Sequence, residues 1–200
     1  MSPPPPRRLT RSEQREATRA VLVATARRLF GARGYAEVST TDIVEGAEVT
    51  RGALYHHFQS KQDLFAAAFQ AQEADMLAAI AAVAAQAQGW ARVEASVRAF
   101  LDACEDEAVR RIVFTDAPAV LGWRAWRDHG GEGVQRLTVA LLGAAMAEGV
   151  LRPGDPDALA VLLLGAMNEA GLALAAADDA VAARRALEVA LLELLGGLRA

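Results

Sequence analysis

Apolar residues recur at helical spacing along most of the chain, and no stretch alternates between apolar and polar positions for more than a few residues. The pattern therefore predicts an all-α fold of about nine helices. In the N-terminal third, hydroxyl side chains mark helix starts, and three of the four are followed three residues later by a carboxylate. These signals predict helices that begin at Thr10, Ser39, Thr50 and Ser60 and end near Gly34, Gly46, Phe58 and Gly89.

The rest of the chain contains longer apolar segments separated by glycine, proline and acidic residues. They predict helices over 90–105 and 107–115, a helix interrupted at Gly130, Gly131 and Gly133, and helices over 156–177 and 179–198. The short early connections indicate a compact three-helix domain over 10–59, followed by a helical domain over 60–200. Residues 1–9 are rich in proline and arginine and predict a solvated polyproline tail without the apolar segment of a secretory signal.

The longest apolar run, 158–177, approaches the length that spans a bilayer. Asn168 and Glu169 lie at its middle, and no aromatic belt or basic flank accompanies it. A helix buried between other helices is therefore favoured over a membrane span. The single cysteine, Cys104, fits a reducing cytoplasm, where we expect the protein to reside.

Charge is distributed unevenly along the chain. Residues 1–61 carry ten basic and six acidic side chains, a net charge of +4, although the whole protein has a net charge of −4. The other 139 residues carry eleven basic and nineteen acidic side chains, a net charge of −8. An overall acidic composition thus hides a basic N-terminal third, which indicates contact with nucleic acid.

The segment TRGALYHHFQSK, Thr50 to Lys61, predicts a helix with two chemically different sides. One side carries Arg51, Gly52, Tyr55 and His56, the other carries Ala53, Leu54 and Phe58, and His57 lies at the margin. The apolar side can pack with Ile43, Ala47, Leu29 and Phe30 in a small core. The remaining side is poor material for a core and is therefore expected to face outward.

The outward side has the chemistry of a DNA-binding surface. Arg51 can donate two hydrogen bonds to guanine, and Gly52 allows close approach of the helix. Tyr55, His56 and His57 can donate to phosphate oxygens. Threonine or lysine at the start of neighbouring helices also suits phosphate, and these residues are Thr40, Thr41 and Lys61.

The same side chains could instead serve as plain surface residues or as metal ligands. Aromatic and histidine side chains can simply decorate a solvated surface, although the helix spacing and local positive charge favour DNA. A zinc site is not predicted, because adjacent residues such as His56 and His57 point about 100° apart on a helix and no third ligand is near.

The sequence LFGARGYAEVSTTDIVEGAEVTRGALYHHFQSKQDLF closely resembles the DNA-binding domain of the TetR/AcrR family of bacterial transcriptional regulators, from about Arg15 to Phe69. The resemblance implies a helix-turn-helix with Thr50 to His57 as the recognition helix. It also implies a homodimer on a near-palindromic operator and an effector site in a variable C-terminal domain. In relatives the positions that commonly meet DNA match Thr40, Thr41, Arg51, Gly52, Ala53, Tyr55, His56, His57 and Lys61.

One position departs from the family pattern. The turn residue that is often glycine is Glu48 here. If Glu48 adopts a positive φ, the strain is on the order of 1 kcal/mol. Its carboxylate is also unfavourable near phosphates, so we expect this turn to lie back from the duplex.

In the acidic remainder, the helices over 156–177 and 179–198 are candidates for the homodimer interface, with an intramolecular hairpin as the alternative. The segment DAPAVLGWRAWRDHGG further resembles a C-terminal domain found in part of the family. Bulky apolar groups with a few polar partners form a candidate pocket for an apolar effector: Phe100, Cys104, Phe114, Trp123, Trp126, Met167 and Asn168. Glu169 is either a buried anchor for a cationic ligand or the partner of an arginine across the interface.

Three classes of function compete. A ligand-responsive repressor accounts for the Thr50–Lys61 segment and needs no metal or cofactor. An enzyme is disfavoured, because no phosphate-binding or dinucleotide glycine pattern is present, and HGGEG at His129 lacks a nucleophile elbow. An adaptor protein would leave the polar face of that segment unexplained.

Overall fold

The structure, a computed structural model, describes residues 10–129 and 131–200, and the side chains of 128–132 are not described. Within that part of the chain all regular elements are helices, apart from an isolated β-bridge between Leu151 and Arg199. The predicted all-α fold is confirmed. The predicted tail at residues 1–9 and the predicted interruption at Gly130 lie outside the described residues.

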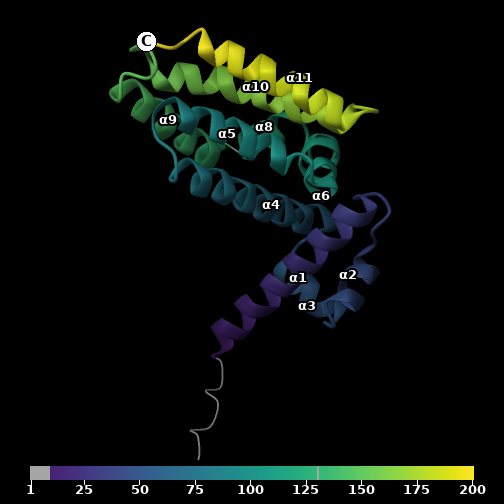
Figure 1. The fold of residues 1–200 in the computed structure, drawn as a ribbon. Coiled ribbons are helices and arrows are strands. Elements are labelled where there is room, and N and C mark those ends of the chain that lie inside the picture. The colour runs from purple at the N-terminus through teal and green to yellow at the C-terminus, as the bar shows by residue number, and fades with distance from the viewer. Residues whose placement is uncertain (1–9, 130) are drawn as a thin grey trace, which may run out of the picture.

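The helices form two lobes joined by the long helix α4 (Figure 1). The small lobe contains α1 (Arg11–Arg33), α2 (Thr40–Gly46) and α3 (Arg51–His57). The large lobe contains α4 (Lys61–Ala84), α5 (Gly89–Ala103), α6 (Glu107–Val109), the π-helix η1 (Arg110–Asp116), α7 (Ala117–Leu121), α8 (Trp123–His129), α9 (Gly131–Ala147), α10 (Pro156–Ala176) and α11 (Ala180–Gly196). Figure 1 shows α10 and α11 side by side on the face that is farthest from α1–α3.

The four predicted helix starts in the N-terminal third are confirmed. Each hydroxyl side chain at the N-cap accepts a hydrogen bond from the backbone N–H three residues later, in α1, α2, α3 and α4. Thr10 and Ser39 also form the reciprocal capping box with Glu13 and Asp42. Because these bonds are local, the sequence is sufficient to locate them.

Later boundaries differ from the prediction. The helix expected to reach Gly89 ends at Ala84, and Gly89, with φ 57°, is the first residue of α5. The helix expected over 107–115 is a turn of α-helix followed by the π-helix η1. Gly122 has φ 86° and separates α7 from α8, a break that was not predicted.

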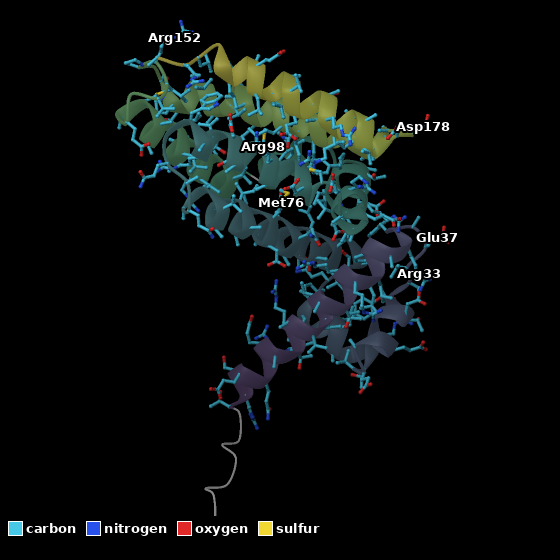
Figure 2. All side chains as sticks on the ribbon, in the orientation of Figure 1. Arg33, Glu37, Met76, Arg98, Arg152 and Asp178 are labelled. Carbon is cyan, nitrogen blue, oxygen red and sulfur yellow. The ribbon has the colours of Figure 1, made fainter. Side chains whose placement is uncertain are left out.

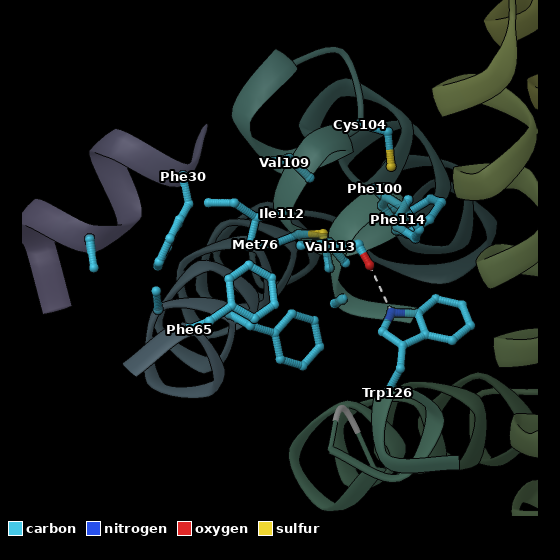
Figure 3. Close-up of a cluster of buried hydrophobic side chains, with 14 of the residues drawn as sticks. Phe30, Phe65, Met76, Phe100, Cys104, Val109, Ile112, Val113, Phe114 and Trp126 are labelled. Atoms are coloured by element: carbon cyan, nitrogen blue, oxygen red, sulfur yellow. Dashed lines mark hydrogen bonds between the residues drawn. The ribbon is translucent and has the colours of Figure 1, made fainter. Parts of the chain in front are cut away.

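The predicted small core is confirmed. Phe30, Ile43 and Leu54 are fully buried, and Phe58 is nearly so. The ring of Phe30 makes an edge-to-face contact with Phe65 of α4, with ring centroids 5.2 Å apart. The buried side chains continue from there into the large lobe as one cluster, so the two lobes share a core (Figure 3).

Arg33 and Arg98, which are labelled in Figure 2, make side-chain contacts between neighbouring elements. At the end of α1, Arg33 donates to the carbonyl oxygen of Glu37 at 2.6 Å and pairs with Asp42 of α2 at 3.2 Å. In the large lobe, Arg98 of α5 donates to Glu188 of α11 at 2.8 Å. These contacts fix α2 beside α1 and α11 beside α5.

The helix α10 packs against η1, α9 and α11. By length and composition it is the one helix in the described residues that could cross a membrane, and only 22% of its most apolar window is buried. Gly171 lies against the ring of Phe114 in the same chain, whereas Gly165 has no atom near its missing Cβ. Gly171 therefore permits a close approach of α10 to η1 within the chain.

Candidate nucleic-acid interface and internal cavity

The turn between α2 and α3 contains a residue with positive φ, which was considered for Glu48 from the sequence. Glu48 has φ 54° and is the one non-glycine residue with positive φ among the described residues. Backbone hydrogen bonds from Glu48 to Glu45 and from Val49 to Val44 close the turn. The Thr50 hydroxyl then accepts from the Ala53 N–H at 3.1 Å and starts α3. This tight connection sets the angle between α2 and α3.

The two sides of α3 are separated as predicted. Leu54 and the following Phe58 are buried, and Ala53 is half-buried. Arg51, Gly52, Tyr55 and His56 are exposed, and His57 at the margin is half-buried. Because the apolar side is used by the core, the polar side is free to meet a partner.

Tyr55 connects α3 to the start of α2. Its side chain is 45% exposed, and the Arg51 guanidinium carbon lies 5.6 Å from the centre of its ring. Hydrogen bonds with the Thr40 side chain and then with Arg51 lower the pKa of the Tyr55 phenol. Thr40 is half-buried and Thr41 beside it is exposed. The structure thus brings Thr40, Arg51 and Tyr55 together on one surface.

Basic residues of α1 lie near the C-terminal end of α3. The Arg19 guanidinium carbon is 5.3 Å from the centre of the Phe58 ring. Burial, followed by the positive charges of His56, Arg15 and Arg19, lowers the pKa of His57. Arg15 and Arg19 were not among the predicted contacts, although they belong to the basic N-terminal third of the sequence.

Lys61, the first residue of α4, lies over an aromatic ring. Its Nζ is 4.1 Å from the centre of the Tyr35 ring, a cation–π geometry. Burial lowers the pKa of Lys61, and the carboxylates of Asp116, Asp42 and Glu37 oppose that shift. The side chain is half-buried at the junction of the two lobes. Lys61 is therefore less free to extend toward a DNA phosphate than the sequence suggested.

The large lobe contains a partly open cavity of about 680 Å³ between α4, α5, η1, α8, α9, α10 and α11. This volume lies in the usual range for small-molecule sites. Five of the seven residues predicted to form a pocket line it: Phe100, Phe114, Trp126, Met167 and Asn168. The Trp126 indole N–H donates to the Val113 carbonyl oxygen at 2.7 Å, which fixes the ring at the cavity wall (Figure 3).

Cys104 and Trp123 do not line the cavity, which corrects two of the predicted pocket residues. Cys104 ends α5 and is buried in the main core, where burial raises the pKa of its thiol to about 12. Trp123 begins α8 directly after Gly122 and is 55% exposed. Glu169 is also exposed and outside the cavity, so it is not the buried anchor that was considered.

A carboxylate that was not among the predicted pocket residues does line the cavity. Glu73 of α4 is half-buried there, and burial raises its pKa to about 7. The other charged lining residues are Arg92 and Arg127, and Arg92 is paired with Glu148 at 2.8 Å. A glutamate in a helix usually faces solvent, so the position of Glu73 in the sequence did not indicate that it lines a cavity.

The π-helix η1 connects the cavity to the small lobe. Val113 and Phe114 line the cavity, while Arg111 and Asp116 contact the end of α1 and the residues after it. Arg111 donates to the Gly31 carbonyl oxygen at 2.8 Å and also to the Ala32 carbonyl oxygen. π-helical segments are rare in proteins, and those that occur are often found at functional sites.

An outward-facing helix-turn-helix attached to a helical lobe with an internal cavity defines a class of protein: the DNA-binding regulators with a ligand-binding domain. Residues 22–68 match the bacterial regulatory proteins of the TetR family, and residues 90–198 match the tetracyclin repressor-like C-terminal domain. The chain therefore belongs to the TetR family and is a DNA-binding transcriptional regulator. These are families of regulators, not of enzymes.

Individual relatives agree with this assignment. The TetC protein of transposon Tn10 from Escherichia coli is 31% identical over 153 residues, which cover 76% of this chain and 78% of TetC. The transcriptional regulator AcrR of Shigella flexneri is 39% identical over 69 residues, 34% of this chain and 32% of AcrR.

Solved structures extend the similarity to the whole fold. A TetR-family transcriptional regulator from Pectobacterium atrosepticum is 38% identical, with a TM-score of 0.83 over 96% of this chain and 98% of that protein. RolR, solved in complex with resorcinol, has the same fold at 22% identity, with a TM-score of 0.73 over 93% of this chain and 91% of RolR.

Proposed function

We propose that the protein is a cytoplasmic, ligand-responsive repressor that binds a near-palindromic operator as a homodimer. The observation that carries the proposal is the exposed polar side of α3, with Arg51 and Tyr55 side by side. The boundary between its DNA-binding and effector domains is proposed at Ser60, the N-cap of α4.

The DNA contacts are proposed residue by residue. Arg51 donates to a guanine edge, and Gly52 and Ala53 let the helix approach the groove. Phosphates are held by the remaining predicted residues, Thr40, Thr41, Thr50, Tyr55, His56, His57 and Lys61. The side chains of Arg15 and Arg19 add positive charge beside His57, which supports a phosphate at that end of α3.

The homodimer is proposed to form through α10 and α11. Large apolar side chains are exposed on both helices: Val161, Leu162, Val181, Val189 and Leu194. Leu162 is 72% exposed, although its helix is otherwise apolar enough to be a core element. Exposed apolar side chains on two adjacent helices are typical of an interface, and the packing of α10 on α11 within one chain leaves them uncovered. Two copies would then present two α3 helices to half-sites about 34–36 Å apart, or a multiple of that distance.

An apolar small molecule in the cavity is the proposed effector. The lining is mainly aliphatic and aromatic, with a few polar groups such as Asn168 and Thr138. RolR, which has the same fold, was solved with resorcinol. Because Phe114 and Arg111 belong to the same π-helix, a ligand that shifts the cavity wall would also shift the end of α1. The switch requires that the ligand favour the non-binding conformation by a few kcal/mol.

The test is fluorescence anisotropy with the DNA upstream of the gene, at low and high salt. Arg51→Ala is expected to reduce the preference for operator over scrambled DNA by about 1–3 kcal/mol, because direct base readout is lost. Arg124→Ala, an exposed arginine on α8, is the matched control and is expected to retain the preference. Unchanged specificity in Arg51→Ala would contradict the assignment of Arg51.

A further inference from the structure

Glu73 brings an unpaired carboxylate into an otherwise apolar part of the cavity. It lies one turn before Met76 and Leu77 and two turns before Ile80 on α4, and all four residues line the cavity. Among the described residues, Glu73 has neither a hydrogen-bond nor an ion-pair partner, and burial is the one cause of its raised pKa of about 7. A half-buried carboxylate that lines a ligand cavity without a partner is a candidate group for binding a ligand.

Among the described residues, the charged groups on the elements around the cavity do not pair with Glu73. Arg92 of α5 pairs with Glu148 and donates to the Ala87 carbonyl oxygen at 3.0 Å. Arg127 of α8 lines the cavity, but its side chain is exposed, and it contributes nothing to the pKa of Glu73.

On the side of α4 that faces α1, charges are paired with one another. Arg27 donates to Gln72 at 2.7 Å and pairs with Asp75. Among the described residues no cation pairs with Glu73, which leaves its carboxylate available to a cationic ligand.

We infer that the effector is a lipophilic amine whose ammonium group pairs with Glu73 while its apolar body fills the cavity. The inference rests on the proposed effector function of the cavity. A charge-assisted N–H···O bond is stronger beside apolar side chains than in bulk water. The aromatic faces of Trp126, Phe100 and Phe114 in the same lining suit a cation as well.

The same geometry disfavours other ligand classes. A carboxylate ligand would place a second negative charge in the cavity with Glu73 and would lose affinity by repulsion. A neutral alcohol of the same length would bury the same apolar surface but leave Glu73 without a cation. An amine therefore gains an ion pair with Glu73 that neither the carboxylate nor the alcohol can form, and the resulting difference in Kd can be measured.

The experiment uses three probes with the same twelve-carbon chain: dodecylamine, dodecanol and dodecanoate, each below its aggregation concentration. Isothermal titration to the full-length protein gives the Kd of each probe at pH 6, 7 and 8. Glu73→Gln removes the carboxylate with little change in shape. Glu45→Gln, an exposed glutamate on α2 outside the cavity, is the matched control. Release of fluorescent operator DNA is measured in parallel.

Dodecylamine is expected to bind the wild-type protein at least tenfold more tightly than dodecanol at pH 8, and dodecanoate more weakly than dodecanol. Because the amine stays protonated over this range, ionisation of Glu73 should strengthen amine binding about tenfold from pH 6 to pH 8. Glu73→Gln should abolish both the preference and the pH dependence, whereas Glu45→Gln should keep them.

Equal affinity for the amine and the alcohol, no binding of the amine, or an unchanged amine Kd in Glu73→Gln would overturn the inference. If dodecanol or dodecanoate binds and releases operator DNA in such a case, the cavity remains an effector site with a different ligand class. Binding in the cavity without release of DNA by any probe would instead count against the proposed function.

Discussion

The guanidinium of Arg111 in η1 donates a hydrogen bond of 2.8 Å to the carbonyl oxygen of Gly31 in the last turn of α1. Two residues after Arg111 the same π-helix begins to line the cavity. Asp116, at the end of η1, accepts a hydrogen bond of 2.7 Å from the Tyr35 N–H, just beyond α1. One short element therefore contacts both the cavity and the helix that supports the DNA-binding lobe.

The first prediction concerns this connection. Arg111→Ala should leave operator affinity within about threefold of wild type, because Arg111 does not belong to the exposed face of α3. The same variant should require several-fold more effector for release of DNA, since the link between cavity and α1 is weakened.

Arg110→Ala is the matched control for that measurement. Arg110 precedes Arg111 in η1 but donates to the carbonyl oxygens of Cys104 and Glu105, at the end of α5, rather than to α1. Operator release titrations should distinguish the two variants. Equal loss of response in both would show that η1 is only a structural support.

The second prediction concerns the strained turn. Glu48→Gly should relieve a left-handed conformation that costs a non-glycine residue about 1–2 kcal/mol. The greater freedom of glycine in the unfolded chain should offset about 0.5–1 kcal/mol of that gain in the free energy of unfolding. The net gain expected in urea unfolding is about 0.5–1 kcal/mol. Glu48→Gln keeps the strain but removes the charge.

The two Glu48 variants separate strain from charge. Both should bind operator DNA more tightly than wild type at low salt, because a negative charge is removed from the DNA-binding lobe. Only Glu48→Gly should gain stability. A more stable Glu48→Gln than Glu48→Gly would contradict the role given to the backbone.

The third prediction concerns pH. In the free protein the pKa of His57 lies below 6.5, so the unfolded chain binds more protons just below that pH and stability falls as pH decreases through this window. A phosphate next to His57 would favour the protonated form and raise its pKa. Operator affinity should therefore increase as pH falls from 7.5 to 6, by at most about tenfold per pH unit for one proton.

His57→Gln should reduce that pH dependence while keeping the salt dependence that comes from the arginines. Anisotropy titrations at constant ionic strength provide the measurement. An equal slope in wild type and variant would exclude His57 as the group that takes up the proton.

The fourth prediction concerns packing. A Cβ added at Gly171 would lie 2.3 to 2.7 Å from atoms of the Phe114 ring, too close for a van der Waals contact. Gly171→Ala should therefore lower the free energy of unfolding by about 1–3 kcal/mol. Gly143→Ala in α9, where nothing lies within 4 Å of the added Cβ, should instead raise it by up to about 1 kcal/mol. Thermal and urea unfolding provide the measurement. A change of stability in the same direction in both variants would contradict the prediction.

Features of this fold were predictable from sequence when the residues that determine them are close along the chain. The caps at Thr10 and Ser39 involve neighbours three residues away, and the two sides of α3 follow from helix periodicity, so both were predictable. The partner of Arg111 lies 80 residues away in sequence, and no local pattern could identify it. The π-helix itself has no distinct sequence signal, because its spacing resembles that of an α-helix.

The cavity was predictable only in part for the same reason. Trp123 and Trp126 are the same type of residue in the same helix, so the sequence did not distinguish them. The break at Gly122 and the packing of α8 bury Trp126 and leave Trp123 exposed. Glu73 was missed because a charged residue in a helix normally indicates solvent. Its place in the cavity depends on how α4 packs against α5, α7 and η1, which is a tertiary property.

The most direct test of the claim that the exposed side of α3 binds DNA is photo-crosslinking of the protein to operator DNA. Benzoylphenylalanine replaces Tyr55 on the exposed side of α3 in one variant and Trp123 on α8 in the control variant, where the native side chains are 45% and 55% exposed. The account predicts a covalent protein–DNA adduct from position 55, within the operator half-sites, and none from position 123. An adduct from position 123 alone, with operator binding retained in both variants, would contradict it.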